Sequence, residues 1–535
     1  MAKRATILFF FFALFIGVLG MRLLTLPQTQ AAQLPQGRMT VTLDHSRGAI
    51  YDCRGVRLVQ ADGGAQTIVV AKPTPEASLA LKSILNEKNW RILQERLEQG
   101  GLVSTPVDVD TVECPDLRLF TAYPRYSGSP LAPHLIGYLN GSNEGVSGLE
   151  LGFDSLLSAA SGDLRAALAS DAYGHSLVGA QIEAEDDGYR SAAGIQITLD
   201  ARIQRIVQDA MIWGDIDLGA VVVLDAQTSE IRALASSPAF DQNNIAASLN
   251  DPREPFLNRA LRALPVGSTF KCFVAAAALE QRVPASRQYT CAGSIDVGGQ
   301  TFYCNNREGH GTLDMGQALT ASCNLYFIQL AQQLEPQPML DLISLFGFGE
   351  ALPLALSLAS AAGNLPSAEA LSVPAELANF SFGQGALLAA PIQIAAATAC
   401  LAADGVYHTP RLMTATVDGY GEKTPWIQDT EQRQVVAAAT AAQLRAMMIQ
   451  AVEQGSARSA KPDVGSAGGK TATAQVGQYT AAGVELKQAG FTGFFPADQP
   501  RYVITVIKQN GGSGSTDCAP VFRRIANAII AQGIS

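Results

Sequence analysis

The most pronounced hydrophobic stretch lies at the start of the chain, where the uncharged run Ala5–Met21 follows Lys3 and Arg4. As a helix at about 1.5 Å per residue, the run extends for roughly 26 Å, slightly short of a bilayer core. Basic residues before such a run favour a cytoplasmic N-terminus. The pattern predicts a retained single-pass membrane anchor in residues 1–27, with the rest of the chain outside the cytoplasm. A cleaved signal peptide and a buried core helix are the alternatives.

Beyond residue 195, segments whose apolar residues recur at helical spacing alternate with short apolar runs typical of strands. Asp200 can cap a helix with apolar residues at helical spacing, and Ala-rich helical sequence dominates residues 270–401. Short apolar runs predict strands on both sides of this block, at 219–225, 230–236, 470–476, 490–495 and 502–508. A helix over 521–531 follows. We therefore predict an α+β domain in which one antiparallel sheet is sandwiched by helices.

The part of the chain before residue 195 predicts a smaller mixed α/β domain. Its first residues, 28–46, are polar and Gln-rich, as in a linker. The clearest helix is expected around 76–99, where leucines and isoleucines recur on one stripe. We divide the chain into an anchor (1–27), a linker with an N-terminal domain (28–194) and a larger domain (195–535).

Composition and charge narrow the function. The net charge of −10 gives no general basis for binding nucleic acid. The five histidines and eight cysteines are dispersed, without HExxH or paired CxxC, so we predict no metal site. An extracytoplasmic location permits a disulfide between Cys291 and Cys304, with free thiols as the alternative. His310 is expected to be a loop or packing residue.

Ser268 and Lys271 form a candidate nucleophile and base. The sequence PVGSTFK precedes a run that favours helix, so both side chains lie on one face near a helix N-terminus. A neutral lysine can take the proton of a serine hydroxyl, provided that burial or a neighbouring cation lowers its pKa. Alone the motif is weak, because a capping serine followed by a surface lysine has the same spacing.

Two further elements follow in order. Ser322 and Asn324 stand one residue apart at the start of a helical stretch, where Ser322 can relay a proton and Asn324 can hold a substrate amide. Lys470 and Thr471 can hold a substrate carboxylate. The N–H of Thr473 can join that of the nucleophile in an oxyanion hole if its strand lies at a sheet edge. Each element alone is also consistent with a helix cap or an ordinary strand.

The three elements, STFK, SCN and KTA, together resemble the motif set of the penicillin-binding proteins. The resemblance extends to other stretches, RGAIYDCRG (47–55), HLIGYL (134–139), GLELGFD (148–154) and GAVVVLD (219–225). The N-terminal stretches are similar to those of class B, the monofunctional kind. The chain departs from the family pattern at Ala472, where glycine is usual, and Cys323 occupies a variable position of the second motif.

The resemblance implies a peptidoglycan D,D-transpeptidase of the bacterial cell membrane, with a penicillin-binding transpeptidase domain after a pedestal domain. Ser268 would attack the carbonyl between two D-alanines of a stem peptide, and an amine of a neighbouring stem would accept the acyl group. β-Lactams would acylate the same serine. A membrane-embedded glycosyltransferase is the implied partner, and no cofactor is implied. A D,D-carboxypeptidase, a β-lactamase or β-lactam sensor, and an inactive scaffold are the alternatives.

Overall fold

The computed structural model describes residues 9–22, 37–171, 173, 175–177, 179–427, 432–479 and 483–534. Residues 9–22 form a helix, and the described part of the chain holds no helix that is both long and apolar enough to cross a membrane. Lys3, Arg4 and most of the expected linker lie outside the described residues. The prediction of an anchor therefore stays a prediction.

The chain divides into two compact units, each built from several stretches of sequence. The first comprises Met1–Ser46, Gly64–Pro124 and Ser161–Tyr189, and the second comprises Arg47–Gly63, Arg125–Ala160 and Arg190–Ser535. Segments 47–63 and 125–160, which the sequence analysis assigned to the N-terminal domain, thus pack with the second unit.

A buried charge network explains why these two segments belong together. Glu150 is fully buried and accepts hydrogen bonds from Arg47 (3.3 Å), from Arg125 (2.8 and 3.0 Å) and from the hydroxyl of Tyr126 (3.0 Å). Arg47 also contacts Asp154 at 2.5 Å. A buried carboxylate needs such partners, because an unpaired one costs several kcal/mol. The RGAIYD and GLELGFD stretches are therefore joined by ion pairs inside the second unit.

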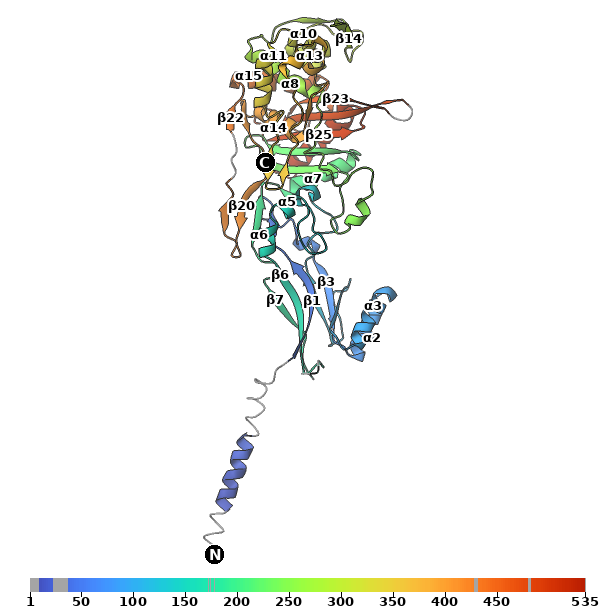
Figure 1. Ribbon diagram of the computed structural model, residues 1–535, viewed down its shortest axis with the longest axis vertical. Coiled ribbons are helices and arrows are strands. Elements are labelled where there is room, and N and C mark those ends of the chain that lie inside the picture. Colours follow the sequence, from blue (N-terminus) through green and yellow to red (C-terminus); the bar gives the residue numbers. More distant parts are fainter. Residues whose placement is uncertain are drawn as a thin grey trace. The chain divides into compact units, whose positions relative to one another are not determined.

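Apart from the helix over residues 9–22, the described residues of the first unit form two small antiparallel sheets and two α-helices (Figure 1). The sheets are β1 (Gly37–Ser46), β6 (Gly162–Ser170) and β7 (Glu183–Asp187), and β4 (Val103–Pro106), β3 (Gln66–Ala71) and β5 (Leu117–Ala122). The helices are α2 (Pro75–Ile84) and α3 (Glu87–Glu98). The prediction of one helix over 76–99 was wrong. Leu85 is extended, and Asn86 caps α3 by accepting a hydrogen bond from the N–H of Asn89.

A five-stranded antiparallel sheet forms the centre of the second unit, and it confirms the predicted sheet. Its order is β10 (Ile231–Ser237), β9 (Gly219–Asp225), β25 (Tyr502–Gln509), β24 (Glu485–Phe495) and β23 (Gly468–Tyr479). Strands from the two ends of the domain meet where β9 pairs with β25. The strand β23, which carries the third motif, lies at the edge.

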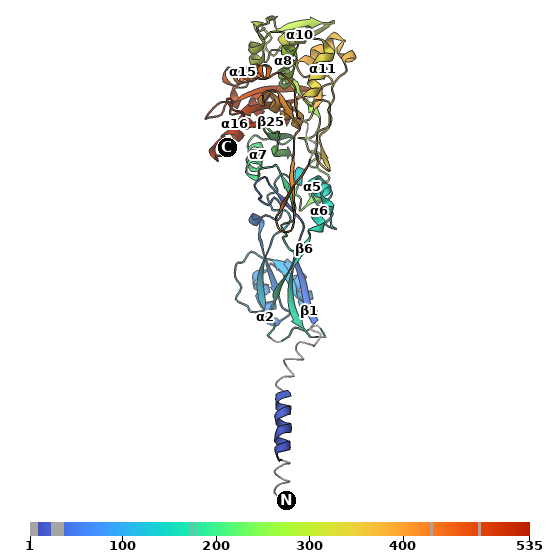
Figure 2. The same cartoon turned by 90° about the vertical axis from the view of Figure 1, so that its left-hand side faces the viewer.

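Helices cover both faces of this sheet (Figures 1 and 2). Successive side chains of a strand point to opposite faces. Val221 and Val223 therefore pack with α7 (Ala201–Trp213) and α16 (Ala519–Ala531), while Val222 and Leu224 pack in the same core as α14 (Pro391–Ala402). Asp200 caps α7 as predicted, by accepting from the N–H of Arg202 at 2.9 Å.

The remaining elements of the second unit surround the sheet. The helical block between β10 and β23 contains α8 (Lys271–Glu280), α9 (Met315–Ala321), α10 (Asn324–Ala331), α11 (Pro336–Leu345), α12 (Ala368–Leu371), α13 (Pro374–Ser381) and α15 (Ala438–Gln454). Short strands within it include β12 (Tyr289–Cys291), β13 (Ser294–Val297), β14 (Gln300–Tyr303) and β15 (Gly311–Leu313). The earlier segments contribute α4 (Pro133–Ile136), α5 (Gly148–Gly152) and α6 (Asp154–Ala159). A second sheet has the order β2 (Ala49–Tyr51), β8 (Gly194–Ile197), β20 (Met413–Val417) and β21 (Lys423–Pro425).

Candidate active site

The three sequence motifs meet at one cleft of about 270 Å³ in the second unit. Its lining includes Ser268, Ser322, Asn324, Thr471, Ala472 and Thr473. The two motif lysines, Lys271 and Lys470, are fully buried beside it. The structure thus brings together all seven residues that the sequence singled out, from the N-terminal end of α8, the junction of α9 with α10, and the edge strand β23.

A glycine turn presents Ser268 to the cleft. Ser268 lies in a single 3-10 turn, Gly267–Phe270, that leads directly into α8. Gly267 has a φ of +67°, a left-handed conformation that favours glycine, and its N–H donates to the carbonyl oxygen of Gly383 at 2.8 Å. Ser268 is half-buried, and Lys271 follows one turn later on the same helical path, as predicted.

Lys271 is held by oxygen atoms of the second motif. Its Nζ donates to the carbonyl oxygen of Ser322 at 2.8 Å, to Oδ1 of Asn324 at 2.7 Å and to Oγ of Ser322 at 3.3 Å. Burial, followed by the nearby charge of Lys470, lowers the pKa of Lys271 to about 7. At neutral pH a large fraction of Lys271 is therefore uncharged and able to accept a proton.

Ser322 links the two buried lysines. Its Oγ accepts a hydrogen bond from Nζ of Lys470 at 2.8 Å in addition to the longer one from Lys271. Burial lowers the pKa of Lys470 to about 8. Among the described residues, neither lysine forms an ion pair with a carboxylate. Ser322 ends α9 with a φ of 55°, and such strain in a residue other than glycine is often retained at functional sites.

The edge strand β23 forms the opposite wall of the cleft. Thr471 donates to the hydroxyl of Ser456 at 3.4 Å, and Oγ1 of Thr473 accepts from the N–H of Gly514 at 3.3 Å. The position of β23 at the sheet edge meets the condition set for an oxyanion hole that includes the N–H of Thr473. The hole itself stays a prediction.

Glycines make room for the methyl group of Ala472, the residue at which the third motif departs from the family pattern. A Cβ placed on Gly267 would lie 3.2 Å from Cβ of Ala472, and one on Gly490 would lie 3.4 Å from it. Gly514 approaches the backbone of the same residue, where a Cβ would come within 2.5 Å of its carbonyl oxygen. Because its neighbours lack side chains, the methyl is accommodated between the strand and the nucleophile turn.

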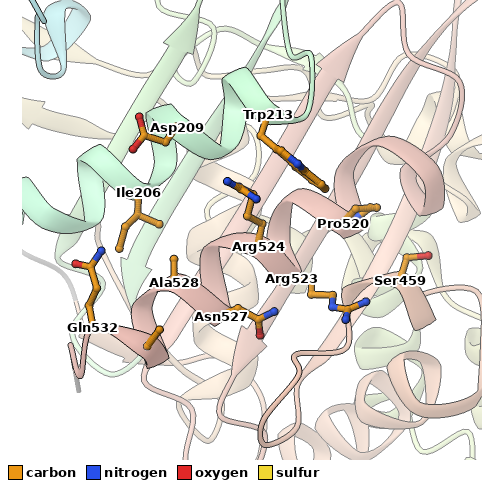
Figure 3. Close-up of a pocket in the computed structure, with 11 residues that line it drawn as sticks. Ile206, Asp209, Trp213, Ser459, Pro520, Arg523, Arg524, Asn527, Ala528 and Gln532 are labelled. Carbon is orange, nitrogen blue, oxygen red and sulfur yellow. The ribbon is translucent and has the colours of Figure 1, made fainter.

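A larger cavity, of about 780 Å³, lies elsewhere in the unit, between α7 and α16 (Figure 3). Asp209 and Trp213 face it from α7, and Arg524 and Asn527 from α16. Arg524 stacks on the ring of Trp213 at 4.9 Å. No motif residue lines this cavity, so size alone does not identify the reactive site.

Sequence reasoning missed one cluster beside the cleft. The side chains of Cys291, Cys304, His310 and Cys323 converge, with their sulphur and nitrogen atoms all within 4.8 Å of one another. All eight cysteines are free thiols, so Cys291 and Cys304 do not form the disulfide that their sequence positions permit. The four residues do not have the short sequence spacing of a common metal-binding motif. They come together because of the path that the chain takes through β12–β15 to the start of α10.

Comparison with known proteins places this site in a family. The penicillin binding protein transpeptidase domain matches residues 219–527. The peptidoglycan D,D-transpeptidase MrdA of Haemophilus influenzae is 30% identical over 371 residues, which are 63% of this chain and 56% of that protein. Stage V sporulation protein D of Bacillus subtilis is 28% identical over 515 residues, 90% of this chain and 77% of that protein. A chain in a solved peptidoglycan synthase complex is 26% identical, with a TM-score of 0.69 and 98% coverage of both chains.

Proposed function

The chain belongs to the penicillin-binding protein transpeptidase family and is a serine-type peptidoglycan D,D-transpeptidase. We propose that Ser268 carries the acyl group in its reaction. The observation that carries this assignment is the convergence of two buried lysines on Ser322, beside the half-buried Ser268. An uncharged amine close to a serine is the arrangement that activates a weak hydroxyl nucleophile.

The acylation step follows from this geometry. The neutral Lys271 takes the proton of Ser268 as Oγ attacks the carbonyl carbon between the two terminal D-alanines of a stem peptide. The tetrahedral oxyanion is stabilised by the N–H groups of Ser268 and Thr473. Collapse breaks the amide bond, and Ser322 passes a proton from Lys271 to the departing amine of D-alanine. The ester on Ser268 is the acyl-enzyme.

Deacylation reverses the proton movements. An amine from a neighbouring stem peptide attacks the ester, and its proton returns through Lys271 to Oγ of Ser268. Lys470 and Thr471 hold the terminal carboxylate of the donor during acylation by charge and hydrogen bond. Asn324 offers its amide to the peptide backbone of the substrate. β-Lactams acylate the same serine because their strained amide and carboxylate have the same arrangement.

The residue assignment predicts a selective loss of labelling. The wild-type chain treated with a fluorescent penicillin becomes covalently labelled, whereas Ser268→Ala does not, because it lacks the hydroxyl that the 3-10 turn before α8 presents to the cleft. Ser286→Ala, which removes an exposed serine, serves as the matched control and labels like wild type. Labelling of a folded Ser268→Ala variant at the wild-type rate would contradict the assignment.

A second prediction concerns Ala472. Because Gly267 and Gly490 already leave room for its methyl group, Ala472→Gly changes the rate of penicillin acylation by no more than about threefold. Ala472→Val places extra carbons against the nucleophile turn and slows acylation by about 100-fold, since displacements near 1 Å have such effects. Stopped-flow fluorescence measures both rates, and circular dichroism checks folding. An increase above tenfold in Ala472→Gly would show that the methyl obstructs the site.

We also propose that the N-terminal segment anchors the enzyme, with the catalytic unit outside the cytoplasm. The helix over residues 9–22 exposes large apolar side chains, from Phe9 (71% exposed) to Leu19 (46%), which are stable in lipid.

The similarity to a chain of a peptidoglycan synthase complex supports a membrane-embedded glycosyltransferase as partner.

Membrane fractionation tests the anchor. After alkaline carbonate extraction the full chain stays in the membrane pellet, whereas a chain starting at residue 37 is released. Recovery of the full chain in the soluble fraction would overturn the proposal of an anchor.

Affinity purification of the chain in mild detergent should also retain glycan-polymerising activity, and the absence of that activity would argue against the proposed partner.

A further inference from the structure

The groove between α7 and α16 is lined by none of the seven motif residues. It is the cavity of about 780 Å³ in the second unit (Figure 3). Its lining on α16 and beyond extends from Pro520 to Gln532, which at 1.5 Å per residue is about 18 Å. A groove of this length and volume can hold a segment of a polymer rather than a single small ion.

An exposed aromatic ring lies at the groove. Trp213 is the last residue of α7 and is 51% exposed. The guanidinium carbon of Arg524 lies 4.9 Å from the centre of the indole, and the two side chains meet between the helices (Figure 3). This contact orients the ring but leaves much of it open. A tryptophan in such a setting suits a ligand with both an apolar face and polar edges.

Planar polar side chains line the groove near Trp213. Among the described residues, Asp209 and Arg524 form no hydrogen bond or ion pair, so their polar atoms are available to a ligand. Asn527 is fixed in place, because its Nδ2 donates to Oδ2 of Asp463 at 2.7 Å and its Oδ1 accepts from the N–H of Asp463 at 2.9 Å. Carboxylate, amide and guanidinium groups each offer coplanar donors or acceptors, which match neighbouring hydroxyl groups of a sugar ring.

The charges that line the groove cancel. Arg523 forms an ion pair with Asp463, and the two remaining charged groups, Asp209 and Arg524, have opposite signs. Binding of an anionic polymer requires an excess of basic groups, and binding of a basic peptide requires an excess of acidic ones. An aromatic ring with planar polar neighbours and no net charge therefore favours a neutral carbohydrate.

One short segment connects the groove with the catalytic cleft. Ser456 lines the cleft and accepts a hydrogen bond from the hydroxyl of Thr471 at 3.4 Å, and Ser459 lines the groove. The three residues between these positions extend for at most about 11 Å. Thr471 is assigned above to the carboxylate of the departing D-alanine. The groove therefore lies on the leaving-group side of the cleft.

We propose that this groove binds part of the glycan strand that bears the acceptor stem peptide, an inference that rests on the proposed function. The acceptor amine must take the place that the amine of D-alanine leaves, so the acceptor approaches from the side of Thr471 and Ser456. A sugar ring stacks on Trp213, while Asp209 and Arg524 form hydrogen bonds with hydroxyl and acetamido groups. Each extended residue of the stem adds at most about 3.6 Å, so a few residues connect the groove with the cleft.

Binding of stem-free glycan strands tests the groove without reference to activity. The strands are peptidoglycan chains from which an amidase has removed the peptides, and calorimetry measures their affinity for the full chain in detergent. The wild type is expected to bind them, and Trp213→Ala should weaken binding by about tenfold. Trp213→Phe should retain part of the affinity because it keeps an aromatic face. Ile212→Ala is the matched control, since Ile212 is the neighbouring residue of α7, is 76% exposed and does not line the groove.

The salt dependence of binding distinguishes a neutral ligand from an ionic one. Stem-free glycan carries no net charge, so its affinity should change by less than about twofold between roughly 0.05 and 0.3 M salt. A steep fall in affinity over this range would show that ion pairing dominates and would overturn the assignment of the groove to a neutral glycan.

Kinetics with acceptors of two sizes separate the groove from the cleft. In Trp213→Ala, penicillin acylation of Ser268 and acyl transfer to a small amine such as glycine should match the wild type, because neither ligand reaches the groove. With a glycan-linked acceptor, KM for the acceptor should rise by about tenfold while kcat stays unchanged. A chain that binds glycan through the groove but is not acylated would overturn the proposed function and leave the glycan site intact.

Two further results would overturn the glycan site. One is a folded wild-type chain that binds no stem-free glycan. The other is an equal affinity in Trp213→Ala and Ile212→Ala, which would place the bound glycan elsewhere on the chain. Circular dichroism checks the folding of each variant.

Discussion

The hydroxyl of Ser322, shared by two fully buried lysines, is the interaction on which the catalytic unit depends. Burying an amine away from water disfavours its charged form, and here no carboxylate offsets that cost among the described residues. The lysines are instead satisfied by oxygens of Ser322, Asn324 and the backbone of Thr471. Burial disfavours the charged form of Lys271 and so lowers its pKa to about 7, a value at which the amine can act as a base at neutral pH.

The surrounding fold brings together the segments that carry Ser322 and the two lysines. The central sheet is buried on both faces, which fixes β23 against the nucleophile turn, and glycines at 267, 490 and 514 allow the backbones to approach closely. Ser322 takes a left-handed conformation that directs both its carbonyl and its hydroxyl to lysines.

The sequence predicts the sheet and the seven site residues because their signals are local. Strand alternation, a capping Asp200 and three motifs in order can each be recognised within a few residues. Features that depend on contacts between segments far apart in the sequence cannot be predicted from such local signals. The break at Asn86 rests on one side-chain cap, the interleaved units rest on the burial of Glu150, and the Cys–His cluster forms only through the path of β12–β15. The hydrogen bond that Lys470 donates to Ser322 likewise requires two segments far apart in sequence.

The acylation rate constant as a function of pH tests the lysine pair most directly. Lys271 must be neutral to act as a base, and its pKa is lowered to about 7, so the rate should rise with pH through that value. Lys470 must be charged to hold the carboxylate, and its pKa is about 8, so the second-order rate should fall above that value. Lys470→Gln should move the acid limb to higher pH, because it removes a charge that lowers the pKa of Lys271. A rate that does not rise with pH through about 7 or does not fall above about 8 would contradict this account, as would an acid limb that Lys470→Gln leaves in place.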